Sequence, residues 1–519
     1  MAAGPSAPSG PDLAQGIALT DLRDGGMLAG HVGEEAVLLA RRGNEFFAVG
    51  ATCSHYGGPL ADGLMVDDQV RCPWHHACFS LRTGEAIEAP AFNPLPRWRV
   101  EARDGKVYVR EKIEAAARPA KRAKSAGEPD RIVIVGGGGA GFAAAEMLRR
   151  AGFGGSLALL SSDDAEPYDR PNCSKDYLAG NAPEEWMPLR PPEFYRDNAI
   201  DLRLRTEVTA IDPRGRTVTL AGGESIPFDK LLLATGAEPI RLDIPGADAP
   251  HVHTLRSLAD ARAIIEKAKS AKRAVVLGAS FIGLEVAAAL RARDIEVHVA
   301  APERLPLERV FGPDLARFVR ALHEVHGVKF HPEQKAAAIE PAQVRLENGT
   351  TLAADLVVVG IGVRPRVALA ERAGLKVDRG VVVNEYLATS APDIFAAGDI
   401  ARWPDPYSAQ LLRIEHWVVA ERQGQAAARN MLGRAEKFTE VPFFWSQHYD
   451  VPINYVGHAE KWDNVVTEGD VDARDVLVRY RRGERVLAVA SIYRDRASLE
   501  AELAMQRDIK SDELAERLL

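Results

Sequence analysis

Two short segments near the N-terminus each place a cysteine close to a histidine. Cys53 and His55 form C-x-H, and after sixteen intervening residues Cys72 and His75 form C-x2-H. Two thiolates and two imidazoles can hold a [2Fe–2S] centre in which histidines replace two cysteines on one iron. A tetrahedral zinc ion takes the same four ligand types and is the alternative. The order Cys–His followed by Cys–His favours iron–sulfur, and these four residues are the predicted metal ligands.

A second group of residues further along the chain is suited to binding a dinucleotide. An apolar run at 132–135 leads into Gly136, Gly138 and Gly141, and an alanine-rich segment follows. This order predicts a strand, a tight turn and a helix, with a pyrophosphate at the helix N-terminus. A glycine-rich turn with a purely structural role is the alternative. Asp163, after the next predicted strand at 157–160, could accept hydrogen bonds from a ribose.

The same arrangement occurs again in the middle of the chain. An apolar run at 274–277 leads into Gly278, Ser280 and Gly283, with serine at the middle glycine position, and the next predicted strand is 295–299. Two such units in one chain predict a dinucleotide site far more specifically than either unit alone.

Composition sets limits on the class of protein. The 519 residues suffice for about three or four domains, and the net charge of −8, with acids and bases mixed along the chain, gives no indication of a nucleic-acid partner. No apolar run approaches the roughly 20 residues of a membrane-spanning helix. The first residues lack a signal-peptide pattern, and four cysteines are too few for a disulfide scaffold, so we expect a cytoplasmic protein.

The motifs resemble two known families. The segments around the paired Cys and His residues, with Gly57-Gly58-Pro59 and Pro73-Trp74, resemble the Rieske ferredoxins of aromatic-ring dioxygenase systems. The stretch PYDRPNCSKDYL at 167–178 is similar to the P-Y-x-R-P-x-L-S-K segment of apoptosis-inducing-factor and ferredoxin-reductase flavoproteins. The domain order is that of the Rieske-bearing, apoptosis-inducing-factor-like branch.

This resemblance implies roles for particular residues. Lys175 would lie beside the flavin N5 and pair with Glu285, and Trp417 would lie at the flavin; these three are the predicted catalytic residues. Further cofactor-binding residues implied by matching family segments are Arg170, Ala234, Thr235, Gly236, Gly362, Gly398, Asp399 and His416. The acidic residue expected after the second strand of the second unit is displaced along the chain to Glu303. With Arg304 adjacent, NADH is favoured as the nicotinamide cofactor, while NADPH stays open.

The resemblance also implies a fold and domain bounds. We expect an N-terminal all-β Rieske domain, two α/β Rossmann-like domains in the glutathione-reductase-like arrangement, and an α+β C-terminal domain. The expected bounds are a disordered tail at 1–12, the Rieske domain at 13–114, a linker at 115–130, an FAD-binding domain at 131–250 and 366–438, an NAD(P)H-binding domain at 251–365, and an interface or dimerisation domain at 439–519. The aromatic residues of this last domain are expected in a core or an interface.

The function implied is that of an FAD-dependent NAD(P)H oxidoreductase. Nicotinamide gives two electrons as hydride and a [2Fe–2S] centre takes one at a time, so a flavin is the required intermediary. We therefore expect electrons to pass from NADH through FAD to the chain's own Rieske cluster and on to an unidentified acceptor. Three alternatives stay open: a dedicated ferredoxin-reductase component of an aromatic-ring oxygenase system, a redox-sensing flavoprotein with slow turnover, and a structural zinc module in place of the cluster.

Overall fold

The computed structural model describes residues 9–114 and 128–507, which form two compact units. One unit comprises 9–114 together with 494–507, and the other comprises 128–493. Most of the expected linker and the first eight residues of the expected disordered tail lie outside the described residues. Pro11 and Asp12, which we expected in that tail, belong instead to the fold, because the Pro11 carbonyl accepts a hydrogen bond of 3.0 Å from the His31 amide.

The first unit is built on an antiparallel six-stranded sheet, which confirms the all-β prediction. Its strands, in spatial order, are β1 (Ile17–Ala18), β10 (Lys106–Ile113), β9 (Arg97–Arg103), β4 (Glu45–Gly50), β3 (Glu35–Arg42) and β2 (Met27–Val32). Side chains alternate along β3, so Leu38 and Ala40 enter one core while Val37 and Leu39 enter a second core on the other face. Both faces of the sheet are therefore covered.

A smaller antiparallel sheet carries one of the two ligand segments. It consists of β5 (Leu64–Val66), β6 (Gln69–Arg71), β7 (Cys78–Ser80) and β8 (Ala86–Glu88). Cys72 follows β6 directly, and Cys53 follows β4 of the larger sheet after two residues. The unit also contains the short 3-10 helices η1 (Leu19–Asp21) and η2 (Leu60–Asp62), and the helix α9 (Asp495–Gln506).

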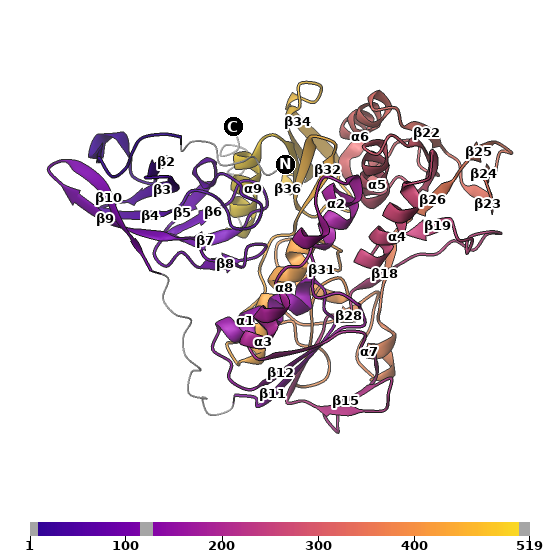
Figure 1. The fold of residues 1–519 in the computed structure, drawn as a ribbon, viewed down its shortest axis with the longest axis horizontal. Coiled ribbons are helices and arrows are strands. Elements are labelled where there is room, and N and C mark those ends of the chain that lie inside the picture. The colour runs from indigo at the N-terminus through magenta and orange to yellow at the C-terminus, as the bar shows by residue number, and fades with distance from the viewer. Residues whose placement is uncertain (1–8, 115–127, 508–519) are drawn as a thin grey trace. The chain divides into compact units, whose positions relative to one another are not determined.

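The second unit contains two parallel five-stranded sheets, in which four strands of each repeat take the same spatial order. Strands of both sheets are labelled in Figure 1. The first runs β13 (Ile200–Arg203), β12 (Ser156–Leu160), β11 (Arg131–Val135), β17 (Lys230–Leu233) and β29 (Ile394–Ala396). The second runs β22 (Lys329–Pro332), β21 (Glu296–Ala301), β20 (Arg273–Leu277), β26 (Leu356–Val359) and β19 (Val252–Thr254). The central strands are apolar and buried on both faces, as covered parallel strands must be. The prediction of two Rossmann-like domains is confirmed.

Each parallel sheet receives a helix immediately after its glycine turn. The helix α1 (Gly139–Arg150) follows β11 and packs along α8 (Trp417–Met431), while α5 (Phe281–Arg291) follows β20. A three-stranded antiparallel insertion precedes the fourth strand of each repeat: β14 (Val208–Asp212), β15 (Thr217–Leu220) and β16 (Ser225–Pro227) in the first, and β23 (Ala336–Glu340), β24 (Gln343–Leu346) and β25 (Thr351–Ala353) in the second.

A further five-stranded antiparallel sheet is formed by the C-terminal part of this unit. Its strands are β32 (Phe443–His448), β33 (Val451–Gly457), β36 (Arg485–Ile492), β35 (Asp475–Arg482) and β34 (Asn464–Asp470). The remaining strands are β18 (Ala237–Pro239) paired with β27 (Val363–Pro365), and β28 (Val381–Val382), β30 (Ala401–Asp405) and β31 (Gln410–Leu412) in one small sheet. The remaining helices are η3 (Arg170–Ser174), α2 (Asp176–Ala179), η4 (Glu184–Trp186), α3 (Pro192–Asp197), α4 (Leu258–Ala268), α6 (Glu308–Val325) and α7 (Ala368–Arg372). None of the helices in the described ranges combines the length and apolarity needed to span a bilayer.

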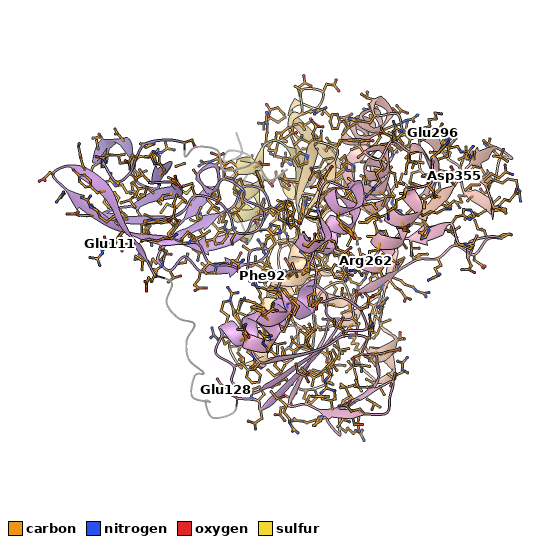
Figure 2. All side chains as sticks on the ribbon, viewed as in Figure 1. Phe92, Glu111, Glu128, Arg262, Glu296 and Asp355 are labelled. Atoms are coloured by element: carbon orange, nitrogen blue, oxygen red, sulfur yellow. The ribbon has the colours of Figure 1, made fainter. Side chains whose placement is uncertain are left out.

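The repeat extends to a carboxylate at the amino end of each sheet. Asp229 accepts hydrogen bonds from the amides of Asp130 and Arg131 at 2.8 and 2.9 Å and from the Arg131 guanidinium at 2.9 Å. Asp355 accepts hydrogen bonds from the amides of Lys272 and Arg273, both at 3.0 Å, and from the Arg273 guanidinium at 3.1 Å. Each carboxylate thus ties the start of the first strand to the start of the fourth. Asp355 and Glu296 lie near one another at this end of the second sheet (Figure 2).

Replacing Asp355 by alanine should destabilise the second dinucleotide domain. The change removes a charged acceptor from two backbone amides and a guanidinium. A hydrogen bond to a charged group contributes about 1.5–3 kcal/mol to the free energy of unfolding. Because the site is partly exposed, we expect a loss of about 1–2 kcal/mol, seen as a lower midpoint of thermal unfolding. Asp248→Ala, at a residue whose side chain is 92% exposed, is the matched control. An equal midpoint for both variants would contradict the proposed role of Asp355.

Candidate functional site

The two predicted ligand segments fold into loops of the same conformation. The Cys53 amide donates to the Gly58 carbonyl at 2.8 Å, and the Cys72 amide donates to the Ala77 carbonyl, also at 2.8 Å. The fifth residue of each loop has a positive φ, +79° at Gly57 and +60° at His76. His76 therefore adopts a left-handed conformation that is uncommon outside glycine, and its neighbours must stabilise it.

The four predicted ligand residues come together as two pairs. The Nδ1 atoms of His55 and His75 lie 3.2 Å apart, and the thiols of Cys53 and Cys72 lie within hydrogen-bonding reach of one another. Within residues 9–114 and 128–507, no three or more His, Cys, Asp or Glu side chains converge as they would around a single ion. Two nitrogen donors beside two sulfur donors fit a two-iron cluster with one pair on each iron, and fit a lone zinc ion less well.

His76, next to the predicted ligand His75, is completely buried and is held by α9. Its Nδ1 lies 2.6 Å from a carboxylate oxygen of Glu502, and its Nε2 lies 3.3 Å from the Ser498 hydroxyl. The Arg71 guanidinium lies 3.7 Å from the same Glu502 oxygen. The last described helix of the chain thus supplies buried polar partners for a ligand loop of the first unit.

A cavity of about 880 Å³ in the second unit is lined by most of the predicted cofactor residues. Lining residues come from both glycine turns, from the 170–175 segment, from α8 and from β32. The predicted residues in the lining are Gly138, Arg170, Lys175, Ala234, Gly236, Ser280, Glu285, Gly362, Gly398, Asp399, His416 and Trp417. Its size and mixed lining are typical of a cofactor site.

The glycines of the first turn have the separate roles expected of a dinucleotide motif. A Cβ on Gly136, where φ is +115°, would lie 2.2 Å from the Ala234 carbonyl oxygen, and one on Gly141 would lie 1.9 Å from the Gly136 carbonyl oxygen. A Cβ on Gly138 would meet nothing closer than the Arg170 guanidinium at 3.5 Å. The second glycine therefore leaves its backbone open to the cavity, as close approach of a pyrophosphate requires.

The second turn is closed in a similar way. Gly278 has a φ of +107°, and a Cβ on Gly283 would lie 2.3 Å from the Gly278 carbonyl oxygen. Ser280 replaces the middle glycine, accepts a hydrogen bond from the Gly283 amide at 3.2 Å and donates to the Gly360 carbonyl at 2.7 Å. The serine thus caps α5 and joins it to the end of β26.

A buried ion pair joins the two dinucleotide domains inside the cavity. Lys175 Nζ lies 2.9 Å from Glu285 Oε2, which also accepts a 2.5 Å hydrogen bond from Ser174. Glu285 Oε1 accepts a 2.6 Å hydrogen bond from Ser446. Burial alone would raise the pKa of Glu285, but Lys175 and the two hydroxyls lower it below its ordinary value. The pair predicted from the resemblance is therefore formed, with Glu285 ionised.

Buried cationic and polar atoms of the cavity still lack protein partners. Arg170 Nε, Arg256 Nε and His416 Nδ1 are buried and accept or donate no hydrogen bond among the described residues. The Arg256 guanidinium pairs with Asp399, and burial lowers the pKa of His416 to about 3, so this imidazole is neutral. An anionic, hydrogen-bonding ligand would satisfy these groups. The residues therefore fit FAD, whose pyrophosphate and ring edges supply such atoms.

Some predicted residues lie outside the cavity lining. The Asp163 carboxylate accepts hydrogen bonds from the Tyr168 hydroxyl at 2.8 Å and from the Asp164 amide at 2.9 Å. The Thr235 hydroxyl donates to the Arg366 carbonyl at 3.1 Å, and Glu303 is exposed after β21. Their assignment to cofactor binding stays a prediction.

Other residues reach the cavity without having been predicted. Phe444 and Trp445, which we expected in a core or an interface, line it, and the Lys175 ammonium lies 5.7 Å from the Trp445 ring centroid. Arg256, just before α4, also lines it. Nothing in the surrounding sequence marks Arg256, whereas the aromatic run at 443–445 was a signal that we assigned to packing.

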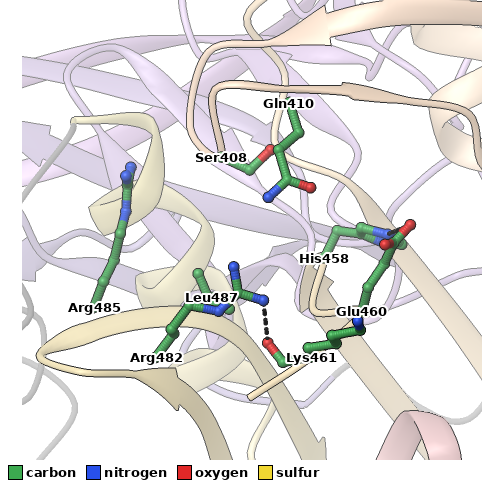
Figure 3. A pocket seen from close by; sticks show the side chains of 8 residues that line it. All are labelled: Ser408, Gln410, His458, Glu460, Lys461, Arg482, Arg485 and Leu487. Atoms are coloured by element: carbon green, nitrogen blue, oxygen red, sulfur yellow. Dashed lines mark hydrogen bonds and ion pairs between the residues drawn. The ribbon is translucent and has the colours of Figure 1, made fainter. Parts of the chain in front are cut away.

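A second cavity of about 380 Å³ lies at the edge of the C-terminal sheet (Figure 3). It is lined by Ser408, Gln410, His458, Glu460, Lys461, Arg482, Arg485 and Leu487, and Arg482 donates to the Lys461 carbonyl at 2.7 Å. It contains neither a glycine turn nor the Lys175–Glu285 pair. The redox site is therefore assigned to the larger cavity.

Replacing Glu421 by glutamine should stabilise the protein at alkaline pH. This completely buried carboxyl lies on α8 beside Trp417 and the N-terminus of α1, and burial, with Asp169 nearby, raises its pKa well above the ordinary value. The unfolded chain loses this proton near pH 4.3, so the wild-type protein loses stability as pH rises from there towards the folded pKa. Glu421→Gln removes this loss. Relative to the wild type, we expect the free energy of unfolding to increase by at least ~1.4 kcal/mol at pH 8 and to be unchanged at pH 4.

Thermal unfolding of the FAD-saturated protein between pH 4 and pH 8 measures this effect. Glu436→Gln, at an exposed carboxylate after the same helix, is the control and should leave the pH dependence unchanged. A Glu421→Gln curve parallel to that of the wild type would show that this carboxyl is already ionised in the folded protein.

Replacing Glu502 by alanine should weaken the cluster domain. The change removes the buried carboxylate that faces His76 Nδ1 and the Arg71 guanidinium, which costs about 2 kcal/mol. We expect earlier thermal loss of the cluster's visible circular dichroism. Glu500→Ala, at the carboxylate that pairs with Arg496 on the same helix, is the control. Equal loss temperatures for the two variants would contradict a role for Glu502 in holding the ligand loop.

Comparison with known proteins agrees with this geometry. Residues 130–424 match the family model for pyridine nucleotide-disulphide oxidoreductases, residues 16–99 match that for the Rieske [2Fe–2S] domain, and residues 443–516 match that for the reductase C-terminal domain. The chain is 34% identical to apoptosis-inducing factor 3 of Homo sapiens, over 92% of this chain and 81% of the relative. It is 37% identical to rhodocoxin reductase of Rhodococcus erythropolis, over 71% of this chain and 88% of the relative.

Solved structures support the same assignment. The crystal structure of the covalent putidaredoxin reductase–putidaredoxin complex matches with a TM-score of 0.71 and 34% identity, over 74% of this chain and 95% of the other. The chain belongs to the pyridine nucleotide-disulphide oxidoreductase family, as an FAD- and NAD(P)H-dependent oxidoreductase of the ferredoxin-reductase type that also carries a Rieske [2Fe–2S] domain.

Proposed function

We propose that this chain oxidises NADH at FAD in the 880 Å³ cavity and passes the electrons singly to its own [2Fe–2S] cluster and then to a separate redox protein. One observation carries the proposal: a single cavity is lined by both glycine turns and contains the buried Lys175–Glu285 pair. FAD, when bound there, supplies the conversion from two-electron to one-electron chemistry.

The protein residues bind and orient the cofactors and stabilise charge. Gly138 leaves room for a pyrophosphate, and Arg170 and Arg256 supply positive charge beside it. Lys175, fixed by Glu285, offers a preorganised positive charge where hydride brings negative charge into the cavity. Phe281 and Trp445 supply apolar walls that exclude water.

NADH is the proposed donor because of the charges that follow β21. Glu303 is exposed there and could accept hydrogen bonds from a ribose, while the Arg304 guanidinium is paired with Glu308 at 2.8 Å. An arginine held in this way is less suited to binding a 2′-phosphate, although such a surface pair is weak.

The cluster is proposed as an internal acceptor because ferredoxin and reductase are parts of one chain. A covalent connection replaces a diffusive encounter by a tethered one at high effective concentration. The acceptor beyond the cluster is a redox protein, for which an oxygenase is one candidate. A dedicated ferredoxin-reductase role is the second candidate, because putidaredoxin reductase, a similar protein, is known from the structure of its covalent complex with putidaredoxin. We further propose a cytoplasmic homodimer: the four cysteines form no disulfide with one another, and the reductase C-terminal match covers the segment expected to serve as an interface.

An anaerobic NADH titration followed by flavin absorbance and low-temperature EPR tests the internal electron path. We expect the flavin absorbance to bleach while a reduced Rieske signal grows. A bleached flavin beside an intact, oxidised cluster would refute transfer within the chain. Long-lived charge-transfer absorbance in air after NADH addition would instead support a redox sensor with slow turnover.

Lys175→Met should slow flavin bleaching by NADH about 100-fold, because one preorganised charge is lost from the site. Stopped-flow absorbance measures this rate. Lys269→Met, at an exposed lysine on the same unit, is the control and should bleach at the wild-type rate. Equal rates for the two variants would remove Lys175 from the proposed role.

A further inference from the structure

A chain of buried polar side chains leaves the cavity on the side of Glu285 that faces away from Lys175. Lys175 bonds to Oε2 of this carboxylate, whereas Ser446 bonds to Oε1 at 2.6 Å. The Ser446 hydroxyl in turn lies 3.3 Å from His448 Nε2. Ser446 and His448 are two residues apart on β32, so they share one face of that strand.

The chain continues to the molecular surface through a second histidine. His448 Nδ1 lies 3.1 Å from Nε2 of His323 on α6, and His323 Nδ1 lies 3.2 Å from the Tyr449 hydroxyl. Both imidazoles are completely buried, whereas Tyr449 is partly exposed. Four consecutive links therefore connect the cavity to solvent within the second unit.

Packing alone does not explain this arrangement. Burying hydroxyls and imidazoles costs free energy that apolar side chains of the same shape would not. Tyr449 also has a φ of +58°, which is strained for an aromatic residue, and this conformation brings its hydroxyl to His323. Both features indicate a functional role for the chain.

The charge state of Glu285 determines the direction of every hydrogen bond. Because this carboxylate is ionised, Ser446 must donate to it, and the serine oxygen must then accept from His448 Nε2–H. His448 Nδ1 consequently accepts from His323 Nε2–H, and His323 Nδ1 accepts from the Tyr449 hydroxyl. All links donate towards Glu285.

Both rings are neutral, as this pattern requires. Burial lowers the pKa of His448 to about 4, with Glu285 and Lys175 as the facing charges. Burial also lowers the pKa of His323 well below its usual value, with His448 and His326 facing it. Arg291 is the charged group that acts on the Tyr449 hydroxyl.

We propose that Glu285, Ser446, His448, His323 and Tyr449 form a proton relay, which carries a proton from solvent to Glu285 when hydride enters the cavity and returns it when the electrons leave. The inference rests on the proposed function, because that function brings hydride to the cavity.

The transfer balances as follows. An O–H bond forms at Glu285 Oε1 as the Ser446 O–H bond breaks; His448, His323 and Tyr449 each pass one proton inward, and solvent reprotonates Tyr449. Glu285 becomes neutral, so Lys175 is left with an uncompensated positive charge for the added negative charge in the cavity. Every link then donates outward, and the reverse transfer restores the first state. The proton taken up by Glu285 is returned to solvent, so it does not appear in the overall reaction. In that reaction NADH reduces two oxidised one-electron centres and gives NAD⁺, two reduced centres and one proton.

Rapid-scan infrared difference spectroscopy of the anaerobic FAD-loaded protein tests the relay. After mixing with NADH we expect a band of a protonated carboxylic acid that shifts in D₂O and is absent from Glu285→Gln. In His448→Phe and Tyr449→Phe this band should appear at least about tenfold more slowly, corresponding to ~1.4 kcal/mol of added barrier. Tyr449→Phe removes only a hydroxyl. The test therefore stands even if His448→Phe, which replaces a buried imidazole, fails to fold.

His326→Phe is the matched control. His326 stacks on Tyr449 with ring centroids 3.6 Å apart, but its Nδ1 bonds to the Leu322 carbonyl at 2.8 Å, so it flanks the chain without being a link. We expect this variant to give the carboxylic acid band at the wild-type rate.

Two results would overturn the relay. The first is the absence of a carboxylic acid band in the wild type although flavin absorbance bleaches normally; that absorbance separates failure of the relay from failure of the proposed function. The second is a band that forms equally fast in all relay variants. Nitrogen-15 NMR of the histidine rings is an independent check, because the structure requires Nε2–H tautomers at both His448 and His323, and a charged ring or an Nδ1–H tautomer at either would contradict it.

Discussion

The buried pair of Lys175 and Glu285 is the interaction on which the arrangement of the second unit depends. Lys175 follows η3 of the first dinucleotide domain, Glu285 lies on α5 of the second, and Ser446 of the C-terminal sheet bonds to the other carboxylate oxygen. A buried charge of either sign would be costly alone, so these three segments must meet for any of them to be stable there. The contact that joins the domains is therefore also the contact that places a positive charge in the cofactor cavity.

The repeated architecture explains why that meeting point is a cavity. Parallel strands of both domains end in glycine turns, and the carboxylates of Asp229 and Asp355 tie the opposite ends of the two sheets by the same set of hydrogen bonds. With the amino ends fixed, the carboxyl ends are left to hold ligands, as in other open parallel sheets. Two such ends lining one space allow two dinucleotides to meet.

Local sequence predicted the parts of the site that are governed by local geometry. Gly136 and Gly141 have no room for a Cβ, so their spacing follows directly from the turn. Lys175 and Glu285 are far apart in the sequence and could be paired only through the family resemblance. Arg256 was missed, because its role depends on Asp399, which is distant in the chain. Trp445 and Ser446 were missed for a related reason: an aromatic–serine stretch gives no indication of whether its strand faces a core or a cofactor.

The buried polar groups of both units follow the same physical rule. His76 adopts its left-handed backbone beside a cluster ligand and is held by Glu502, and Tyr449 adopts the same backbone region to reach His323. In each case the side chain of a residue with a left-handed backbone bonds to an element far away in the sequence, α9 for His76 and α6 for Tyr449. Since these contacts require the complete tertiary structure, they form only in the folded chain. The first lies beside the predicted cluster loop, and the second connects to the cofactor cavity through His448 and Ser446. At these two places buried polar side chains offer preorganised charge and controlled proton access, which have chemical consequences where electrons are transferred.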